Sequence, residues 1–121
     1  MKFDLDKMYC GAIKRGDILL AHLEEGEEVV IAVQENILNE RLSTVLAVPI
    51  EPHSAGKIVF KNELLLSAKE LSLGQAGVCL PHKMKPYDRR RLTAKKGELN
   101  KQRLAELYSI IDVNLGRFRD R

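Results

Sequence analysis

The chain has 121 residues, of which 45% are hydrophobic and 31% are charged, and these values fit a single globular domain. The first ten residues contain two aspartates and no apolar run, so we expect no secretory signal. No stretch approaches the roughly 18 uninterrupted apolar residues that a membrane-spanning helix requires, so we expect no membrane partner. The sequence therefore favours a small cytoplasmic protein that folds as one domain over residues 1–121.

The two cysteines, Cys10 and Cys79, have neither a CxxC spacing nor a histidine at ligand distance in the sequence. This pattern argues against a structural zinc site and against a disulfide framework. We expect two buried free thiols, as is usual in a reducing cytoplasm, with a Cys10–Cys79 bridge as the alternative.

Charge is distributed unevenly, although the net charge is only +3. Residues 1–52 contain five Lys/Arg against ten Asp/Glu, whereas residues 53–121 contain fifteen against seven. The densest basic block, residues 83–103, holds nine basic residues against two acidic ones. Such a block favours contact with a polyanion through phosphate pairing and counterion release, and the alternative is an ordinary solvated basic face.

Alternating and β-branched apolar residues predict several short strands. Residues 29–34 (VVIAVQ) and 44–50 (TVLAVPI) are apolar on both faces, which is typical of buried central strands. We expect strands at 14–23, 29–34, 44–50 and 57–60, with turns at 35–43. Two short strands are expected around Gly74 within 64–80. Residues 81–97 are expected to form a loop, with a short helix or turn near 87–92.

The last element is a predicted amphipathic helix over residues 100–114. Asn100 is a good N-cap, Leu99 can pack on Leu104, and Gly116 is a natural terminator. An apolar stripe follows helical spacing and consists of Leu104, Leu107, Tyr108, Ile111 and Leu115. Short strands followed by one such helix indicate a mainly β fold, a small barrel with a helix packed against it.

No standalone catalytic motif is present: the sequence has no GxSxG, HExxH, Gly-rich phosphate loop or spaced Cys/His cluster. The three histidines lie in separate predicted elements, and each is more typical of a surface or turn residue than of a catalyst.

The order of several segments is more specific than any single motif. RGDILLAHL (15–23), followed by VVIAVQENILNERLSTVLAVPI (29–50), resembles the PemK/MazF pattern of an RGD-type first strand and a VVVxQ(N/S)(D/N)xxNxxSxTVxxxPIT block. KMKPYDRRRL (83–92) and the closing helix GELNKQRLAELYSIIDVNLG (97–116) are similar to the family's later segments. The resemblance covers about residues 12–117.

This resemblance implies a small Src-homology-3-like barrel of the CcdB/PemK/MazF type, assembled as a homodimer and bound by a cognate antitoxin protein. Active members of the family are sequence-selective endoribonucleases that cleave single-stranded RNA without a metal or other cofactor. The 2′-hydroxyl attacks the neighbouring phosphorus, which requires a base, an acid and donors for the phosphoryl oxygens.

The resemblance also implies candidate site residues. Thr44 matches a Ser/Thr position that donates to a phosphoryl oxygen, and the alternative is that Ser43 and Thr44 only begin the strand. The remaining positions expected to contact RNA are Arg15, Asn36, Asn39, Ser43, Lys83 and Lys85.

The chain departs from the family where active members carry an Arg at the start of the second strand, because Glu27 and Glu28 stand there. The acidic connection EEGEE (24–28) further opposes RNA binding. Two explanations compete. Either the barrel has lost catalysis and serves as a binding or regulatory module, or other groups act, with His22 as the base and Arg41 as the cation.

Overall fold

The computed structural model describes residues 8–117. Seven strands form one antiparallel sheet in the order β4-β5-β3-β2-β1-β7, and β6 pairs separately with β3. The elements are β1 (Asp17–Leu23), β2 (Gly26–Ala32), α1 (Asn36–Arg41), β3 (Thr44–Pro52), β4 (Leu64–Leu66), α2 (Ala68–Leu71), β5 (Gly77–Cys79), η2 (Pro81–Lys83), β6 (Lys85–Asp88), η3 (Arg89–Arg91), β7 (Leu92–Glu98) and α3 (Lys101–Leu115).

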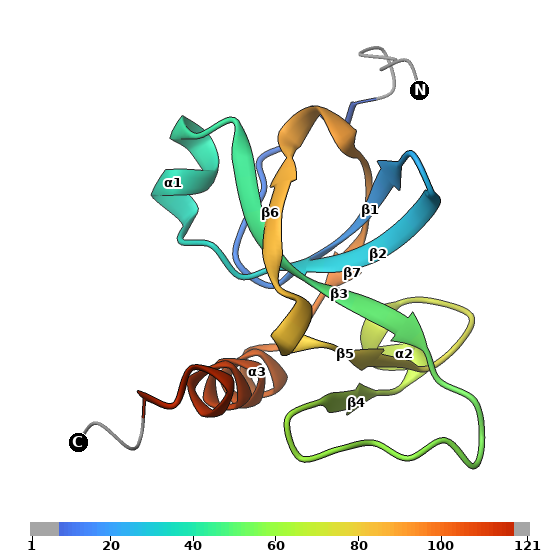
Figure 1. Cartoon of the computed structure of the whole chain (residues 1–121). Helices are drawn as coiled ribbons and strands as arrows, with labels where there is room; N and C mark the ends of the chain where they lie inside the picture. The colour runs from blue at the N-terminus through green and yellow to red at the C-terminus, as the bar shows by residue number, and fades with distance from the viewer. Residues whose placement is uncertain (1–7, 118–121) are drawn as a thin grey trace.

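Five of these strands curl into the expected small barrel. Strands β7, β1, β2, β3 and β6 follow one another around it, and the short turn η3 leads from β6 into β7 (Figure 1). No ladder joins β6 to β7 within residues 8–117, so backbone hydrogen bonds do not close the barrel completely. The predicted fold class is confirmed.

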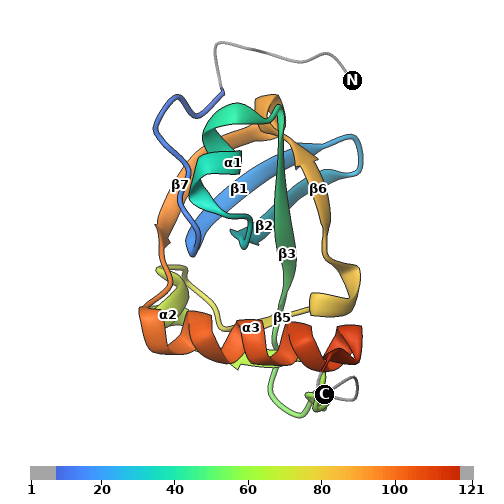
Figure 2. The ribbon, with the colours of Figure 1, turned by 90° about the vertical axis from the view of Figure 1, so that its left-hand side faces the viewer.

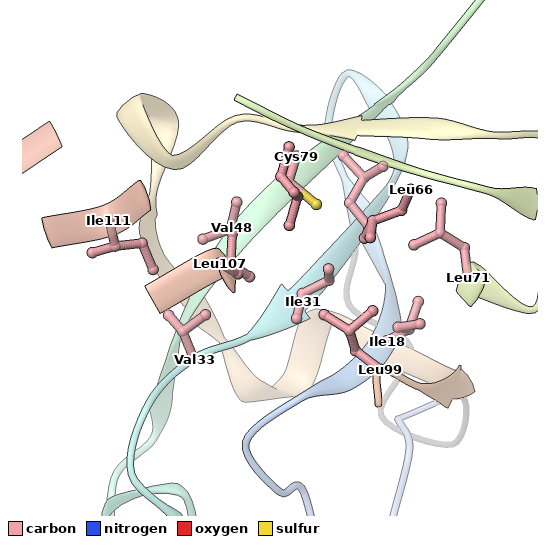
Figure 3. Packing of buried hydrophobic residues seen from close by; sticks show 12 residues of the cluster. Ile18, Ile31, Val33, Val48, Leu66, Leu71, Cys79, Leu99, Leu107 and Ile111 are labelled. Carbon is pink, nitrogen blue, oxygen red and sulfur yellow. The ribbon is translucent and has the colours of Figure 1, made fainter. Parts of the chain in front are cut away.

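The central strands are buried on both faces, as their composition predicts. Val30 and Ala32 of β2 pack inside the barrel, whereas Ile31 between them packs against the opposite layer. The inner core also contains Ile13, Leu19, Ala21, Val45, Ala47, Tyr87 and Leu92. The outer core lies between the barrel and the layer of β4, β5, α2 and α3, and Figure 3 shows its packing.

Helix α3 lies across the end of the barrel (Figure 2). The predicted caps are confirmed: the Asn100 side chain accepts a hydrogen bond from the Arg103 amide at 2.9 Å, and Gly116 ends the helix with φ of 71°. Leu107 and Ile111 are buried in the outer core. Leu115, predicted to continue the stripe, is instead 58% exposed.

Several sequence predictions were wrong. The turn expected at 35–43 contains α1, whose first amides are capped by the Glu35 carboxylate. Residues 57–60 form no strand, because their backbone groups bond within turns, Lys57 to Ser54 and Phe60 to Glu63.

The segment 64–80 holds α2 between its two strands, with the Ser67 side chain as N-cap. The loop expected at 81–97 contains β6 and β7, which pair with strands distant in sequence, although the turn near 87–92 is present as η3. Cys79 is buried and free as expected, but Cys10 is exposed rather than buried. No helix within the described residues is long and apolar enough to cross a membrane.

The contrast between Leu107 and Leu115 on α3 tests how much the helix contributes to stability. Leu107 is fully buried, so Leu107→Ala should lower the free energy of unfolding by about 2–5 kcal/mol. Leu115→Ala, the matched control at an exposed position, should change it by less than about 0.5 kcal/mol. Urea unfolding measures both values, and equal costs would contradict the observed docking of α3.

Candidate functional site

A groove of about 670 Å³ opens where β2 begins and β3 ends. Residues 27–29 of β2 and 49–52 of β3 form one part of its wall, and the loop 73–77 forms another. Leu80, Lys83 and Lys85 complete it. The groove therefore includes the start of the second strand, where the family resemblance places a catalytic cation.

The strand register explains how acidic and basic residues meet in this groove. Val29 pairs with Ile50, so the next residues toward the strand ends, Glu28 and Glu51, both line the groove. The Leu80 amide bonds the Pro49 carbonyl at 3.0 Å, and η2 then turns the chain toward β6. This turn brings Lys83 to Glu51, with 3.6 Å between Nζ and Oε1.

The ion pair between Lys83 and Glu51 is weak. Both side chains are more than half exposed, so the pair stabilises the fold by at most about 1 kcal/mol. Because this ion pair is weak, the Lys83 ammonium group can move to a bound phosphate at little cost in free energy. Lys85 is placed differently, with its Nζ 5.1 Å from the centre of the Tyr87 ring in a cation–π contact.

Glu28 is held by Tyr87, whose phenol donates a hydrogen bond to the Glu28 carboxylate. Tyr87 is buried in the inner core, and its burial raises the pKa of the phenol, with the hydrogen bond and negative charge of Glu28 raising it further. The Glu28 carboxylate is thus held in place by a neutral hydrogen-bond donor.

Much of the predicted basic block serves the fold. Arg103 bonds the Glu70 carboxylate at 2.7 Å and the Leu65 carbonyl at 2.6 Å, which ties α3 to α2 and β4. Lys95 pairs with the buried Asp17 at 3.3 Å, and the Arg89 guanidinium donates to the Gly11 carbonyl at 2.7 Å. Lys83 and Lys85 are the members of the block that line the groove.

A second group of predicted site residues surrounds α1, at the other end of β3. The Arg15 amide donates to the Asn36 side chain at 2.8 Å, and the Gln34 side chain donates to the Thr44 carbonyl at 2.9 Å. Arg41 ends α1 and is exposed, and the Ser43 carbonyl accepts a hydrogen bond from the Arg89 amide at 2.9 Å.

Asn39 belongs to the interior of this second group. Its side-chain oxygen accepts a hydrogen bond from the side-chain amide of Gln34 at 2.9 Å, and its side-chain nitrogen donates to the backbone carbonyl of Gln34 at 3.0 Å. Only 3% of the residue is exposed. These bonds hold α1 against β3. Asn39 therefore lies in the interior and is not available for the RNA contact that the sequence predicted.

The three predicted catalytic residues come from different elements: Arg41 ends α1, Thr44 begins β3 and His22 lies on β1. Thr44 and Glu51 are seven residues apart on β3, roughly 23 Å along an extended strand. His22 is exposed and pairs with Glu27 across β1 and β2, so it lies at the rim of the groove without lining it. Of the predicted residues, Lys83 and Lys85 lie inside the groove.

Sequence reasoning did not single out Glu51 or Tyr87. A signal for Glu51 existed, because a carboxylate ends an otherwise apolar strand directly before Pro52. Tyr87 gave no signal, since its segment was interpreted as a loop. Within residues 8–117 no three His, Cys, Asp or Glu side chains are grouped so that they could hold a metal ion.

The bond between Tyr87 and Glu28 predicts a loss of stability in alkali. Because folding raises the pKa of Tyr87, its contribution is complete below the unfolded value of about 10 and is lost as the pH rises above it. The free energy of unfolding should fall there by about 1.4 kcal/mol per pH unit for this group, and Tyr87→Phe should remove that part of the slope. Chemical unfolding at several pH values measures it, and an unchanged slope would contradict the assignment.

No curated protein sequence matches the chain at a significant level. The solved structures that resemble it include a mycobacterial endoribonuclease in complex with its cognate antitoxin (17% identity, TM-score 0.76, covering 87% of this chain and 96% of that one). They also include the Mycobacterium tuberculosis toxin MazF-mt6 (19% identity, TM-score 0.72, covering 83% and 96%) and MazE–MazF from Deinococcus radiodurans (20% identity, TM-score 0.71, covering 88% and 98%).

At these identities the structural likeness establishes the fold alone. The family follows from the sequence, because residues 14–115 match the model of the PemK-like, MazF-like toxins of type II toxin–antitoxin systems. This match covers most of the chain, from just before β1 to the last residue of α3. The chain therefore belongs to the PemK-like, MazF-like toxin family.

Proposed function

We propose that this toxin-family protein is a sequence-selective endoribonuclease that binds single-stranded RNA in the groove between β2, β3 and β6 and cleaves it without a metal. One observation carries the proposal: the position of the family's catalytic cation lies in a groove that also contains Lys83 and Lys85. Family membership and the endoribonuclease described among the similar structures support it.

Cleavage by 2′-hydroxyl attack requires stabilisation of the charged phosphoryl oxygens. Lys83 and Lys85 are the cations that the groove offers for this purpose, and either lysine can pair with a phosphate. The exposed Glu51 is a candidate acceptor of the 2′-hydroxyl proton, and His22 at the rim is the other candidate base. Arg41 and Thr44, at the far end of β3, form the competing assignment.

The carboxylates of the groove should make this enzyme slow. Glu27, Glu28 and Glu51 oppose two lysines there, so the groove carries more negative than positive side chains. A guanidinium at the position of Glu28 would bind phosphate bidentately, whereas the carboxylate repels it. We expect weaker cleavage than that of relatives with an Arg at this position.

The proposed partners follow from the same relatives. Two of the similar structures are complexes of a toxin with its antitoxin, so we propose a cognate antitoxin for this chain as well. We also propose a two-fold homodimer, as the family resemblance implies.

Salt dependence and lysine replacement test the RNA groove. Binding of a short unstructured RNA should weaken steeply with salt, and Lys83→Ala with Lys85→Ala should weaken it further and flatten the salt slope by about two phosphate contacts. Lys96→Ala with Lys101→Ala is the matched control, because these exposed lysines do not line the groove. Fluorescence anisotropy measures the RNA affinity of both double variants. Equal losses of affinity in the two would show that the basic block is an ordinary solvated face.

Restoring the family's cation tests the catalytic assignment. Glu28→Arg should increase the rate of RNA cleavage by about 10²–10³, the usual contribution of one preorganised donor. Glu40→Arg makes the same change of charge on the exposed surface of α1 and should leave the rate within a few-fold. A time course on a long unstructured RNA without metal gives the rates.

Further variants decide between the two ends of β3. If Thr44→Ala or Arg41→Ala abolishes cleavage while the Lys83 and Lys85 variants cut normally, the catalytic site lies around α1 and not in the groove. If the protein binds RNA but neither wild type nor Glu28→Arg cleaves it, the alternative of a binding or regulatory barrel replaces the enzyme.

A further inference from the structure

A second, smaller cavity of about 190 Å³ adjoins the groove at the end of β3. Glu51, Pro52 and Leu80 line both cavities, so the two lie side by side. The outer wall comes from the segment that leads from β3 to β4, drawn in green below these strands in Figure 1. Its apolar members are Ile58 and Phe60.

Both apolar side chains are strongly exposed although their backbone is fixed. Ile58 is 76% exposed and Phe60 is 62% exposed. The Phe60 amide donates to the Glu63 carboxylate at 3.1 Å, and the Glu63 amide donates to the Phe60 carbonyl at 3.0 Å. These reciprocal bonds close a turn that holds the phenyl ring at the surface.

Contacts on both sides of this turn stabilise the segment further. The Asn114 side chain of α3 donates to the Asn62 carbonyl at 3.2 Å, and the His53 amide donates to the Ala76 carbonyl at 3.0 Å. The His53 ring also bonds the Lys57 carbonyl at 3.3 Å. The aromatic wall is therefore preorganised, and a ligand that stacks on it need not order the loop first.

We infer that this cavity binds one unpaired nucleobase of single-stranded RNA, which stacks on Phe60 while the adjoining phosphates lie beside Lys83. The inference rests on the proposed function, and it adds a base subsite to the phosphate groove. Proteins that bind single-stranded RNA combine a basic track for the backbone with aromatic rings for the bases. Here the two features adjoin, because Glu51 pairs with Lys83 in the groove and also lines the cavity that contains Phe60.

Replacement of Phe60 tests the subsite. Phe60→Ala should weaken binding of a short unstructured RNA roughly 5- to 150-fold, the usual effect of losing one stacked base. Phe60→Tyr keeps the ring and should bind as wild type does. Leu65→Ala is the control, because this exposed apolar side chain on β4 lines neither cavity. Thermal unfolding of each variant verifies that the fold is intact.

An abasic chain of the same length and charge shows whether the base is the occupant. Wild type and Phe60→Ala should bind the abasic chain equally, because the lysines contact only its phosphates. Equal RNA affinity of wild type and Phe60→Ala, with weaker binding by the Lys83 and Lys85 variants, would overturn the base subsite and leave the proposed function intact. A failure of every protein to bind RNA would overturn both.

Phe60→Ala also separates a nucleobase from a protein occupant. A shift of its sedimentation behaviour without a change in RNA affinity would assign the Phe60 face to contact between copies of the chain and would overturn the inference.

Discussion

Burial of β2 and β3 on both faces is the constraint on which the rest of this structure depends. Val30 and Ala32 face the barrel interior while Ile31 faces the layer of β4, β5, α2 and α3. Strand β2 pairs with β1 on one side and with β3 on the other, so its alternate residues reach both cores. Both hydrophobic cores are built on this ladder.

The same ladder determines where the groove forms. Alternate residues of a strand share a face, so Glu28 continues the row of Val30 and Ala32 to the rim of the inner core. There it accepts the hydrogen bond of the buried Tyr87. The polar end of a buried strand thus becomes one wall of an open groove, and the loop before β5 and the turn η2 supply the others.

Charge distinguishes this chain from the pattern expected of its family. Glu27 and Glu28 stand where the resemblance places basic residues, and two lysines from a distant part of the sequence line the same groove. The result is a groove with mixed charges beside an exposed aromatic wall. The proposed phosphate groove and base subsite together predict a protein that depends more on nucleobases than on backbone charge for affinity.

The sequence by itself determined the elements whose signals are local. Strands β1, β2 and β3 follow from apolar periodicity, and α3 with its Asn100 and Gly116 caps follows from short-range hydrogen bonding. Residues 85–98 gave no such signal, because β6 and β7 are strands only through pairing with β3 and β1. Residues 57–60 gave a false signal, since their short apolar run has no partner strand among the described residues. Only the tertiary structure could place Lys83 beside Glu51 and Phe60 beside the groove, because residues far apart in sequence meet there through strand register and side-chain packing.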